Sequence, residues 1–260
     1  MQTEQSRLHS RMEESHWWFT GRREILRRLV RQALPPDGQT VLDIGCGTGG
    51  NLAAFAAEYR CIGWDPSEEA IRLARQRYPS IRFFSGLLQE TIASLPQPPD
   101  LILANDVLEH VRADQALLSQ LVQALRPGGH LLITVPAGME LWSPHDVSVG
   151  HVRRYERTQL ERLWAREPVS ASLVSYYNAR LYPVVRCVRF VTRRRGQAHG
   201  EAETDFRMPP APVNRLLHRF FAAEAGVLVD LMRGKRSGGF TRGVSLIALL
   251  KKKEVAANGS

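Results

Sequence analysis

The sequence Val41-Leu42-Asp43-Ile44-Gly45-Cys46-Gly47-Thr48-Gly49-Gly50 decides the fold of this chain. Its apolar residues predict a buried strand, its glycines predict a tight loop, and the residues from Asn51 to Tyr59 predict a short helix. Glycine lets the backbone adopt positive φ and lets a ligand approach closely, and the free N–H groups of a helix start would face that ligand. The stretch therefore predicts a nucleotide-type binding loop.

Asp43 separates two interpretations of this loop. The spacing of Gly45, Gly47 and Gly50 fits the G-x-G-x-x-G pattern of dinucleotide-binding proteins. A carboxylate two residues before the first glycine would repel a pyrophosphate, but it suits a ligand with an ammonium group and no phosphate. The stretch resembles the first motif of the class I S-adenosylmethionine (SAM) methyltransferases, an acid followed by x-G-x-G-x-G. The resemblance implies SAM as cofactor, bound by Asp43, Gly45, Cys46 and Gly47.

Later motifs follow in the order of the same family. The apolar run Cys61–Asp65 predicts a second strand, and Asp65 lies about 20 residues past the glycines, where an acid reaches ribose hydroxyls. Asn105-Asp106-Val107-Leu108-Glu109-His110 follows the fourth strand and resembles the D-V-L-E-H motif, which implies that Asn105 and Asp106 line the cofactor site near the sulfonium. For His110 a structural role is favoured over a catalytic one. Leu125-Arg126-Pro127-Gly128-Gly129 resembles the L-x-P-G-G motif before the fifth strand, and the resemblance covers roughly residues 38–136.

The predicted fold class is α/β, with a doubly wound, mostly parallel, seven-stranded Rossmann-like sheet. We expect strands at 41–44, 61–65, 81–84, 100–104, 130–135 and 169–176, and an antiparallel last strand at 243–250. The chain is divided into an N-terminal helical lid (1–36), a SAM-binding core (37–176) with a substrate loop (136–156), a helical insertion or cap between strands 6 and 7 (177–240), and the last strand with its tail (241–260).

The N-terminal segment carries an unusual group of aromatic residues, Glu13-Glu14-Ser15-His16-Trp17-Trp18-Phe19. Three consecutive aromatic side chains cannot all face one core, so we expect Trp17 or Trp18 to cover the substrate; packing of these rings is the alternative. Similar E-x-x-H-W-W-F segments precede the SAM motif in a group of bacterial small-molecule methyltransferases, where the helix acts as a lid.

The loop beyond the fifth strand is dense in groups for proton transfer and anion binding. His145 and His151 are the candidate general bases, with Asp146 orienting one of them. Arg153 and Arg154 are candidates to clamp a carboxylate or phosphate of the substrate, beside Tyr155. The alternative is that these groups bond one another and only order the loop. We assign no metal site, because no clear third and fourth ligand accompany His145, Asp146 and His151.

The net charge of +9 lies on the flanks of the chain: residues 1–36 carry +3, residues 37–150 carry −6, and residues 151–260 carry +12. This distribution favours an anionic partner for the flanks. Residues 181–195 and 213–232 predict amphipathic helices joined by a polar linker at 196–212, and the basic face of 181–195 suggests peripheral membrane contact. No signal peptide or transmembrane run is apparent, which predicts a cytoplasmic protein.

The sequence thus predicts a SAM-dependent methyltransferase that modifies an oxygen or nitrogen of a small-molecule acceptor, anionic or lipid-bearing. An RNA methyltransferase is one alternative, but neither an N-P-P-Y-type motif nor an appended RNA-binding module is visible, so nucleic acid is disfavoured as a partner. A non-catalytic SAM-binding or membrane-associated protein is the other.

Overall fold

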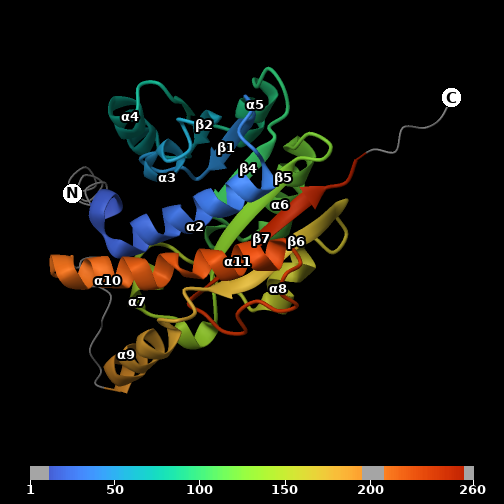
Figure 1. Cartoon of the computed structure of the whole chain (residues 1–260). Helices are drawn as coiled ribbons and strands as arrows, with labels where there is room; N and C mark the ends of the chain where they lie inside the picture. Colours follow the sequence, from blue (N-terminus) through green and yellow to red (C-terminus); the bar gives the residue numbers. More distant parts are fainter. Residues whose placement is uncertain (1–11, 195–207, 255–260) are drawn as a thin grey trace.

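The computed structural model describes residues 12–194 and 208–254, and within them one seven-stranded sheet organises the chain (Figure 1). The strand order is β3-β2-β1-β4-β5-β7-β6. β7 runs antiparallel to β5 and β6, while the other neighbours are parallel. The strands are β1 (Thr40–Ile44), β2 (Arg60–Trp64), β3 (Arg82–Phe84), β4 (Leu101–Asn105), β5 (His130–Pro136), β6 (Val169–Tyr177) and β7 (Ser245–Lys252). The predicted fold class and its antiparallel last strand are confirmed.

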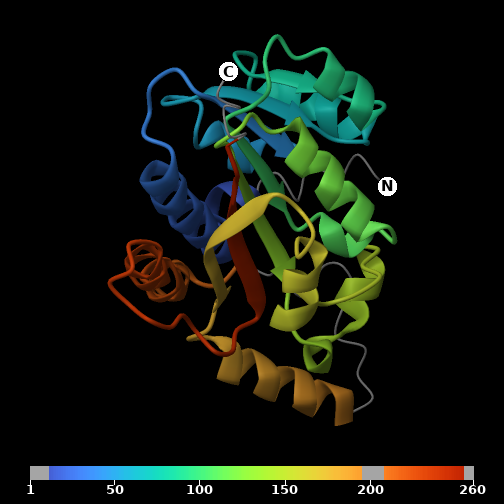
Figure 2. The same cartoon turned by 90° about the vertical axis from the view of Figure 1, so that its right-hand side faces the viewer.

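Helices cover both faces of the sheet (Figure 2). One face carries α2 (Trp17–Ala33), α3 (Gly50–Ala53), α4 (Glu68–Arg77), α10 (Ala211–Ala222) and α11 (Glu224–Met232). The other carries α5 (Leu88–Ala93), α6 (Asp114–Ala124) and α8 (Arg157–Leu163). The carboxyl edge of the sheet is followed by the short turns η1 (Leu108–His110) and η2 (Met139–Leu141) and by α7 (Pro144–Ser148) and α9 (Tyr182–Arg194).

Alternation along the central strands gives each face its own core. In β4, Leu101 and Leu103 belong to the cluster that includes α2, whereas Ile102 and Ala104 belong to the cluster that includes α6. All four residues are wholly buried. A parallel strand covered on both faces needs apolar residues at every position, which is why these strands read as continuous apolar runs.

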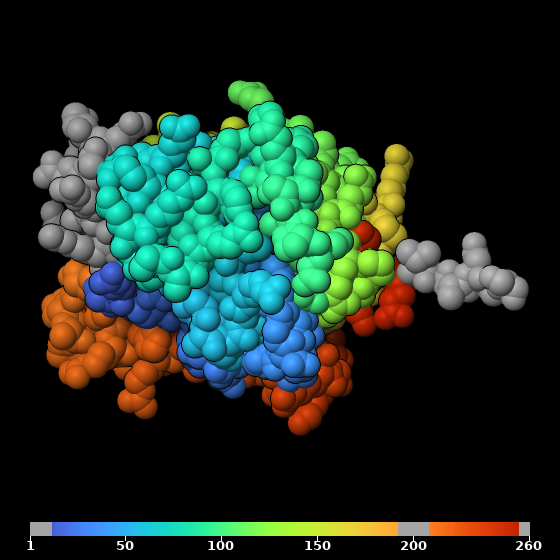
Figure 3. Space-filling model, turned by 90° about the horizontal axis from the view of Figure 1, so that it is seen from above, coloured from blue at the N-terminus to red at the C-terminus, as the bar shows by residue number. Residues whose placement is uncertain are grey.

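The helix α2 serves two purposes along its length. Its second half presents Ile25, Leu26, Leu29 and Val30, all wholly buried, to the sheet and is therefore a core helix. Only its first turns, up to Arg22, reach the carboxyl edge of the sheet. Figure 3 shows these first turns between the region that contains the glycine loop and α4 and the insertion helix α10. A lid role for residues 1–36 stays a prediction, and it would concern this end of α2.

The insertion differs from its predicted form. One helix was expected over Val213–Met232, but the chain bends at Ala223 into α10 and α11. The bend brings the buried carboxylate of Glu224 to the backbone N–H of Arg180, 2.9 Å away. No proline or glycine stands at Ala223, and the bend coincides with this tertiary contact. Most of the linker predicted at 196–212 lies outside the described residues.

α10 docks directly on α2, although the two helices are far apart in sequence. The backbone N–H of Trp17 donates to Asn214 Oδ1 at 2.8 Å, and its ring meets Phe221 edge-on. Phe221 is wholly buried and stacks on Tyr177 with 5.9 Å between ring centroids. The insertion therefore completes the helical layer on this face.

Two further details concern single helices. The helix predicted from Asn51 to Tyr59 is only the four-residue α3, because its hydrogen bonds then tighten into turns. In the part of the chain that the structure describes, we find no helix that is both long enough and apolar enough to cross a membrane.

Candidate functional site

The glycine loop after β1 forms an open cradle at the carboxyl edge of the sheet. Gly45 and Gly47 have φ of +69° and +54°, and a Cβ added at Gly47 would meet no atom within 4 Å. The N–H of Gly47 donates to Asp65 Oδ2 at 2.9 Å, while Oδ1 of the same carboxylate accepts from Ser67 N. The loop after β2 therefore holds Asp65 beside the cradle, where the sequence predicts a ribose. The thiol of Cys46 is buried, and burial raises its pKa.

The floor of the site carries buried polar groups. Asp43 is 2% exposed, and burial raises its pKa to about 7, although the nearby charge of Arg22 acts in the opposite direction. Asn105 is buried as well, and its amide lies close enough to Asp43 to lower the pKa of that carboxyl. Its amide atoms form no hydrogen bond of good geometry within the described residues, which is rare for buried polar atoms and favours a place prepared for a ligand.

Asp106 adopts a backbone conformation that is uncommon for a non-glycine residue, with φ of 54°. Its N–H donates to the backbone oxygen of Thr134, and its Oδ1 accepts from the hydroxyl of Thr134 at 3.1 Å. Its Oδ2 accepts from Arg22 Nη1. These contacts hold the carboxylate at the end of β4 in spite of the unfavourable backbone conformation. Residues with strained backbones are often found at functional sites.

Arg22 is the residue that the sequence analysis missed. Its guanidinium, 6% exposed, lies 4.3 Å from the centroid of the Trp18 ring and forms an ion pair with Asp106. A signal for it exists, because Phe19, Arg22 and Ile25 follow helical spacing on the apolar face of α2. A charge on a buried face indicates a partner inside the protein, here the acids at the carboxyl edge.

The segment ahead of α2 is tied to the glycine loop. Glu13, 8% exposed, accepts from the hydroxyl of Thr48 at 2.8 Å and from Arg77 at 3.1 Å. His16 caps the helix by accepting from the backbone N–H of Trp18. The E-x-x-H-W-W-F segment is therefore a clamp on the loop. Trp17 lies against α10 and Trp18 supports Arg22, so their contact with a substrate stays a prediction.

The substrate loop is organised by the wholly buried Asp146. Its Oδ1 accepts from His151 Nδ1 and from Arg154 Nε, each at 2.8 Å, and its Oδ2 accepts from Ser143 N. Burial alone would raise the pKa of this carboxyl, but the hydrogen bonds from His151 and Arg154 lower it well below its usual range. Asp146 thus stays ionised and fixes the orientation of His151.

Two residues of this loop require a correction. Arg154 is buried between Asp146 and the backbone oxygen of Ala137. Tyr155 is 2% exposed, and its hydroxyl donates to Asp114 Oδ2 at 2.7 Å. Their polar groups are used inside the protein, so the predicted substrate contacts do not fit; both residues order the loop instead.

The remaining loop residues are more accessible. Arg153 pairs with Asp114 at 2.5 Å but keeps a third of its side chain exposed. His145 is half-buried in α7. Their predicted roles in anion binding and proton transfer stay predictions. The loop also closes onto η1, because the N–H of Val152 donates to the backbone oxygen of Glu109 at 2.8 Å.

A cavity of about 810 Å³ lies beyond the carboxyl end of β6. Its walls combine arginines and aromatic rings with one acid, namely Arg180, Arg186, Arg242, Tyr182, Phe190, Phe240 and Glu140. β6 is parallel to β5, since both are antiparallel to β7, so this cavity opens at the same edge of the sheet as Asp106. Ligands in open α/β sheets bind at this edge.

A family model described as a methyltransferase domain matches residues 18–168. Trans-aconitate 2-methyltransferase of Azoarcus sp. (strain BH72) is 35% identical over 118 residues, which are 44% of this chain and 46% of that protein. A probable S-adenosylmethionine-dependent methyltransferase of Mycolicibacterium smegmatis is 29% identical over 157 residues, 58% of each protein. The chain spans about half the length of the curated relatives it matches.

Solved structures share the fold at low sequence identity. A chain in the complex between the Haloferax volcanii Trm112 methyltransferase activator and a putative methyltransferase superimposes with a TM-score of 0.57 at 17% identity, over 97% of this chain and 96% of that one. The plantazolicin methyltransferase BamL, solved with SAH, gives a TM-score of 0.57 at 14% identity, over 96% and 91% of the two chains. At such identities the likeness concerns the fold alone.

Proposed function

This chain belongs to the methyltransferase-domain family, and from that premise we propose that it transfers a methyl group from SAM to an oxygen or nitrogen of an anionic small molecule. The observation that carries the proposal is the pairing of Arg22 with Asp106 above the buried Asp43. These charges lie at the carboxyl edge of the sheet and match a zwitterionic amino-acid group, which SAM carries and a dinucleotide lacks.

The residues at this edge fit SAM. Asp43 would accept from the ammonium group, and Arg22 would pair with the carboxylate of the methionine moiety. Asp65 would accept from the ribose hydroxyls, and the buried amide of Asn105 beside Asp43 offers both a donor and an acceptor. The open space at Gly47 lets a ligand lie against the backbone. The individual assignments of Asp43, Gly45, Cys46, Gly47, Asp65, Asn105 and Asp106 remain proposals.

The chain's own contribution to the reaction is positioning. SAM supplies a methyl group activated by its sulfonium, so the protein mainly has to align donor and acceptor and exclude water. Asp106 is held at the end of β4, at the same edge of the sheet as the proposed SAM site, by its hydrogen bond from Thr134. Glu13 accepts a hydrogen bond from Thr48 and so ties the segment ahead of α2 to the glycine loop. An acceptor that carries a proton needs a base, for which His145 and His151 remain the candidates.

The acceptor is proposed to be anionic on two grounds. One of the two curated relatives named above is a trans-aconitate methyltransferase, and trans-aconitate is a polycarboxylate. The cavity beyond β6 brings Arg180, Arg186 and Arg242 together with apolar rings, and guanidinium groups bind carboxylate and phosphate well. α9 also exposes the apolar residues Val184, Val188 and Phe190. A lipid-bearing acceptor and a membrane contact through residues 181–195 therefore stay predictions.

A thermal-shift and labelling experiment tests this function. SAM and S-adenosylhomocysteine are expected to raise the melting temperature, because each binds only the folded protein, whereas NADH should not. Incubation with SAM deuterated in its methyl group and a panel of polycarboxylates and phosphorylated metabolites should give one product heavier by the labelled methyl. Stabilisation by NADH alone would favour a dinucleotide-binding protein instead. SAM binding without any labelled product would favour a non-catalytic SAM-binding protein.

Arg22→Met provides a sharper prediction about the cofactor. Removing the guanidinium should weaken SAM binding about tenfold, because a charge-assisted hydrogen bond is lost. Methylthioadenosine lacks the amino-acid group, so its affinity should not change. Calorimetry with both ligands separates recognition from general damage. Arg27→Met is the matched control, since Arg27 lies on the same helix as Arg22 and pairs with Glu58, which lies outside that helix. Equal weakening of the binding of both ligands in Arg22→Met would contradict the assignment.

A further inference from the structure

Glu109 is a wholly buried carboxyl group, and neither of its oxygens has a side-chain hydrogen-bond partner. Burial and the nearby Asp106 raise the pKa of Glu109 well above its usual value. Its own backbone N–H and the charges of Arg22 and Arg154 act to lower this pKa. The imidazole of His151 lies beside this group, with Nε2 3.8 Å from Oε1. A buried carboxylate with so few donors is costly for the folded protein unless it is protonated or a cation completes it.

His151 is oriented toward this carboxyl group. Its Nδ1 bonds to Asp146 Oδ1, and Asp146 is itself fixed by Arg154 and Ser143. When a carboxylate accepts from Nδ1–H, the lone pair of the ring lies on Nε2. The same carboxylate–histidine arrangement orients metal ligands in many proteins, because it sets both the tautomer and the ring direction.

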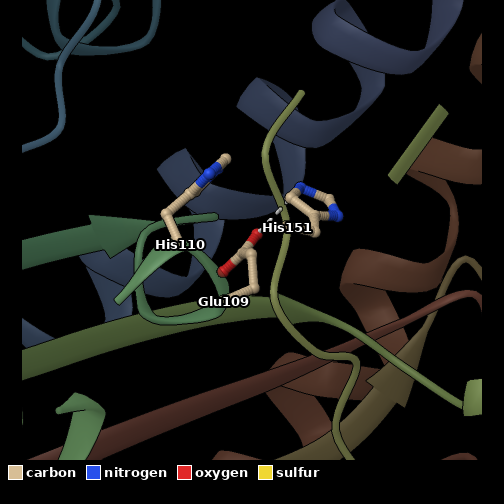
Figure 4. A group of neighbouring side chains, drawn as sticks. All are labelled: Glu109, His110 and His151. Atoms are coloured by element: carbon tan, nitrogen blue, oxygen red, sulfur yellow. Dashed lines mark ion pairs between the residues drawn. The ribbon is translucent and has the colours of Figure 1, made fainter. Parts of the chain in front are cut away.

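His110 supplies a third donor from the same turn as Glu109. Its ring lies edge-on to the ring of His151, with 4.8 Å between centroids. Figure 4 shows Glu109 and His110 projecting from η1 toward the loop that carries His151. One ligand atom of each residue lies within 4.8 Å of the others. Ligand atoms around bound zinc are about 3.3 Å apart, so the three side chains would have to move closer together to hold an ion.

We propose that Glu109, His110 and His151 form a binding site for a divalent transition-metal ion. Two imidazole nitrogens and one carboxylate oxygen suit Zn²⁺, Co²⁺ or Mn²⁺, whereas Mg²⁺ and Ca²⁺ prefer oxygen ligands. Three protein ligands leave a coordination position open. Asp146 acts as the outer partner that orients His151. With Nδ1 on Asp146 and Nε2 on the ion, His151 would not also act as the general base, and His145 would remain the candidate for that role.

The position of the Glu109–His110–His151 cluster connects it to the proposed methyl transfer. A role of the ion in that reaction rests on the proposed function. Glu109 is three residues beyond Asp106, and both follow β4 at the carboxyl edge of the sheet. An acceptor oxygen in the open coordination position would be held at this edge, and the ion would stabilise its negative charge. The acceptor class that fits is then an oxygen acid or an alcohol next to a carboxylate, since both can bind a metal ion.

Metal titration of tag-free, chelator-treated protein tests the site without SAM. Co²⁺ should bind with a stoichiometry of one and give visible absorption bands of an ion with nitrogen ligands. Glu109→Gln and His110→Gln should each lower the Co²⁺ affinity about tenfold or more, since even outer-partner substitutions cost that much. His218→Gln on α10 removes a histidine outside the cluster and should bind Co²⁺ as the wild type does.

Two outcomes overturn the proposal. One is the absence of saturable Co²⁺ and Zn²⁺ binding; the other is binding that Glu109→Gln leaves unchanged, which would show that the carboxyl group is only a protonated core residue. SAM-induced stabilisation is measured separately on the same proteins. Loss of metal binding with intact SAM binding therefore rejects the metal site alone, and the reverse result rejects the methyltransferase function alone.

Discussion

The Asp43→Asn protein is expected to be more stable than the wild type at pH 8 and to bind SAM about ten- to a hundredfold more weakly. Asp43 is 2% exposed, and its pKa of about 7 lies well above its ordinary value of 3.8. The ionised carboxylate is therefore unfavourable in the free protein at pH 8. It becomes useful when an ammonium group binds, because a hydrogen bond between charged groups contributes about 1.5–3 kcal/mol.

The pH dependence of the free energy of unfolding follows from the raised pKa of Asp43. Between pH 3.8 and about 7 the folded protein keeps a proton that the unfolded chain has lost, so the contribution of Asp43 to the free energy of unfolding falls as pH rises. The loss is about 1.4 kcal/mol per pH unit and is complete above pH 7. Asp43→Asn lacks this titration, so its advantage should grow from pH 5 to pH 8 and reach up to about 4 kcal/mol.

Urea unfolding across this pH range, together with calorimetry for SAM, measures both parts of the prediction. Asp100→Asn is the matched control, because Asp100 precedes β4 at the opposite edge of the sheet, where it accepts from Thr40 N and pairs with Arg126. Its SAM affinity should equal that of the wild type. Unchanged SAM binding in Asp43→Asn would remove the ammonium contact from the proposal.

Asp146→Ala is expected to lower the free energy of unfolding by about 3–5 kcal/mol. Asp146 is wholly buried and accepts from His151, Arg154 and Ser143, and the side chain of Arg154 is only 4% exposed. Removing the carboxylate leaves the guanidinium buried and unpaired, which is the costly way to break a buried ion pair. The loop should lose its order, and methyl transfer should fall with it.

The matched control is Glu161→Ala, which also deletes a carboxylate paired with an arginine. The pair with Arg157 is exposed on α8, with 47% and 38% of the side chains accessible, and such pairs contribute about 0.5 kcal/mol or less. The effect of Asp146→Ala should shrink as pH falls below the ordinary carboxyl value of 3.8, since the pKa of Asp146 is lowered in the folded protein. Similar losses in both variants would show that Asp146 is not the organising group.

The sequence was sufficient for the fold because its signals are local. Strand, glycine loop and helix follow each other at Val41–Gly50, and the apolar run before Lys251 marks the antiparallel last strand. The bend at Ala223 was missed because it accompanies a tertiary contact, the hydrogen bond from the backbone N–H of Arg180 to Glu224. A contact between residues 44 positions apart leaves no trace in local periodicity.

The site residues that directly follow a strand were predicted from the sequence. Those that come together only when two distant segments meet were missed. Asp43, Asp65 and Asp106 follow or end strands, so the topology alone brings them to one edge. Arg22 arrives from α2, and the cluster at Glu109 forms only when the substrate loop folds back. The buried Arg154 shows the opposite error, because a charged residue in a loop was expected to be accessible.

The docking of α10 on α2 has a consequence for synthesis of the protein in the cell. The apolar face of α2 leaves the ribosome early, but the helices that cover it, α10 and α11, end at Met232. At about 5–20 residues per second, the ribosome needs about 10–40 s to make the chain between them. During that time the part of α2 that α10 and α11 cover stays exposed, although β1 and β4 already offer it a sheet to pack on. The nascent chain is expected to depend on chaperones until α10 and α11 have been translated.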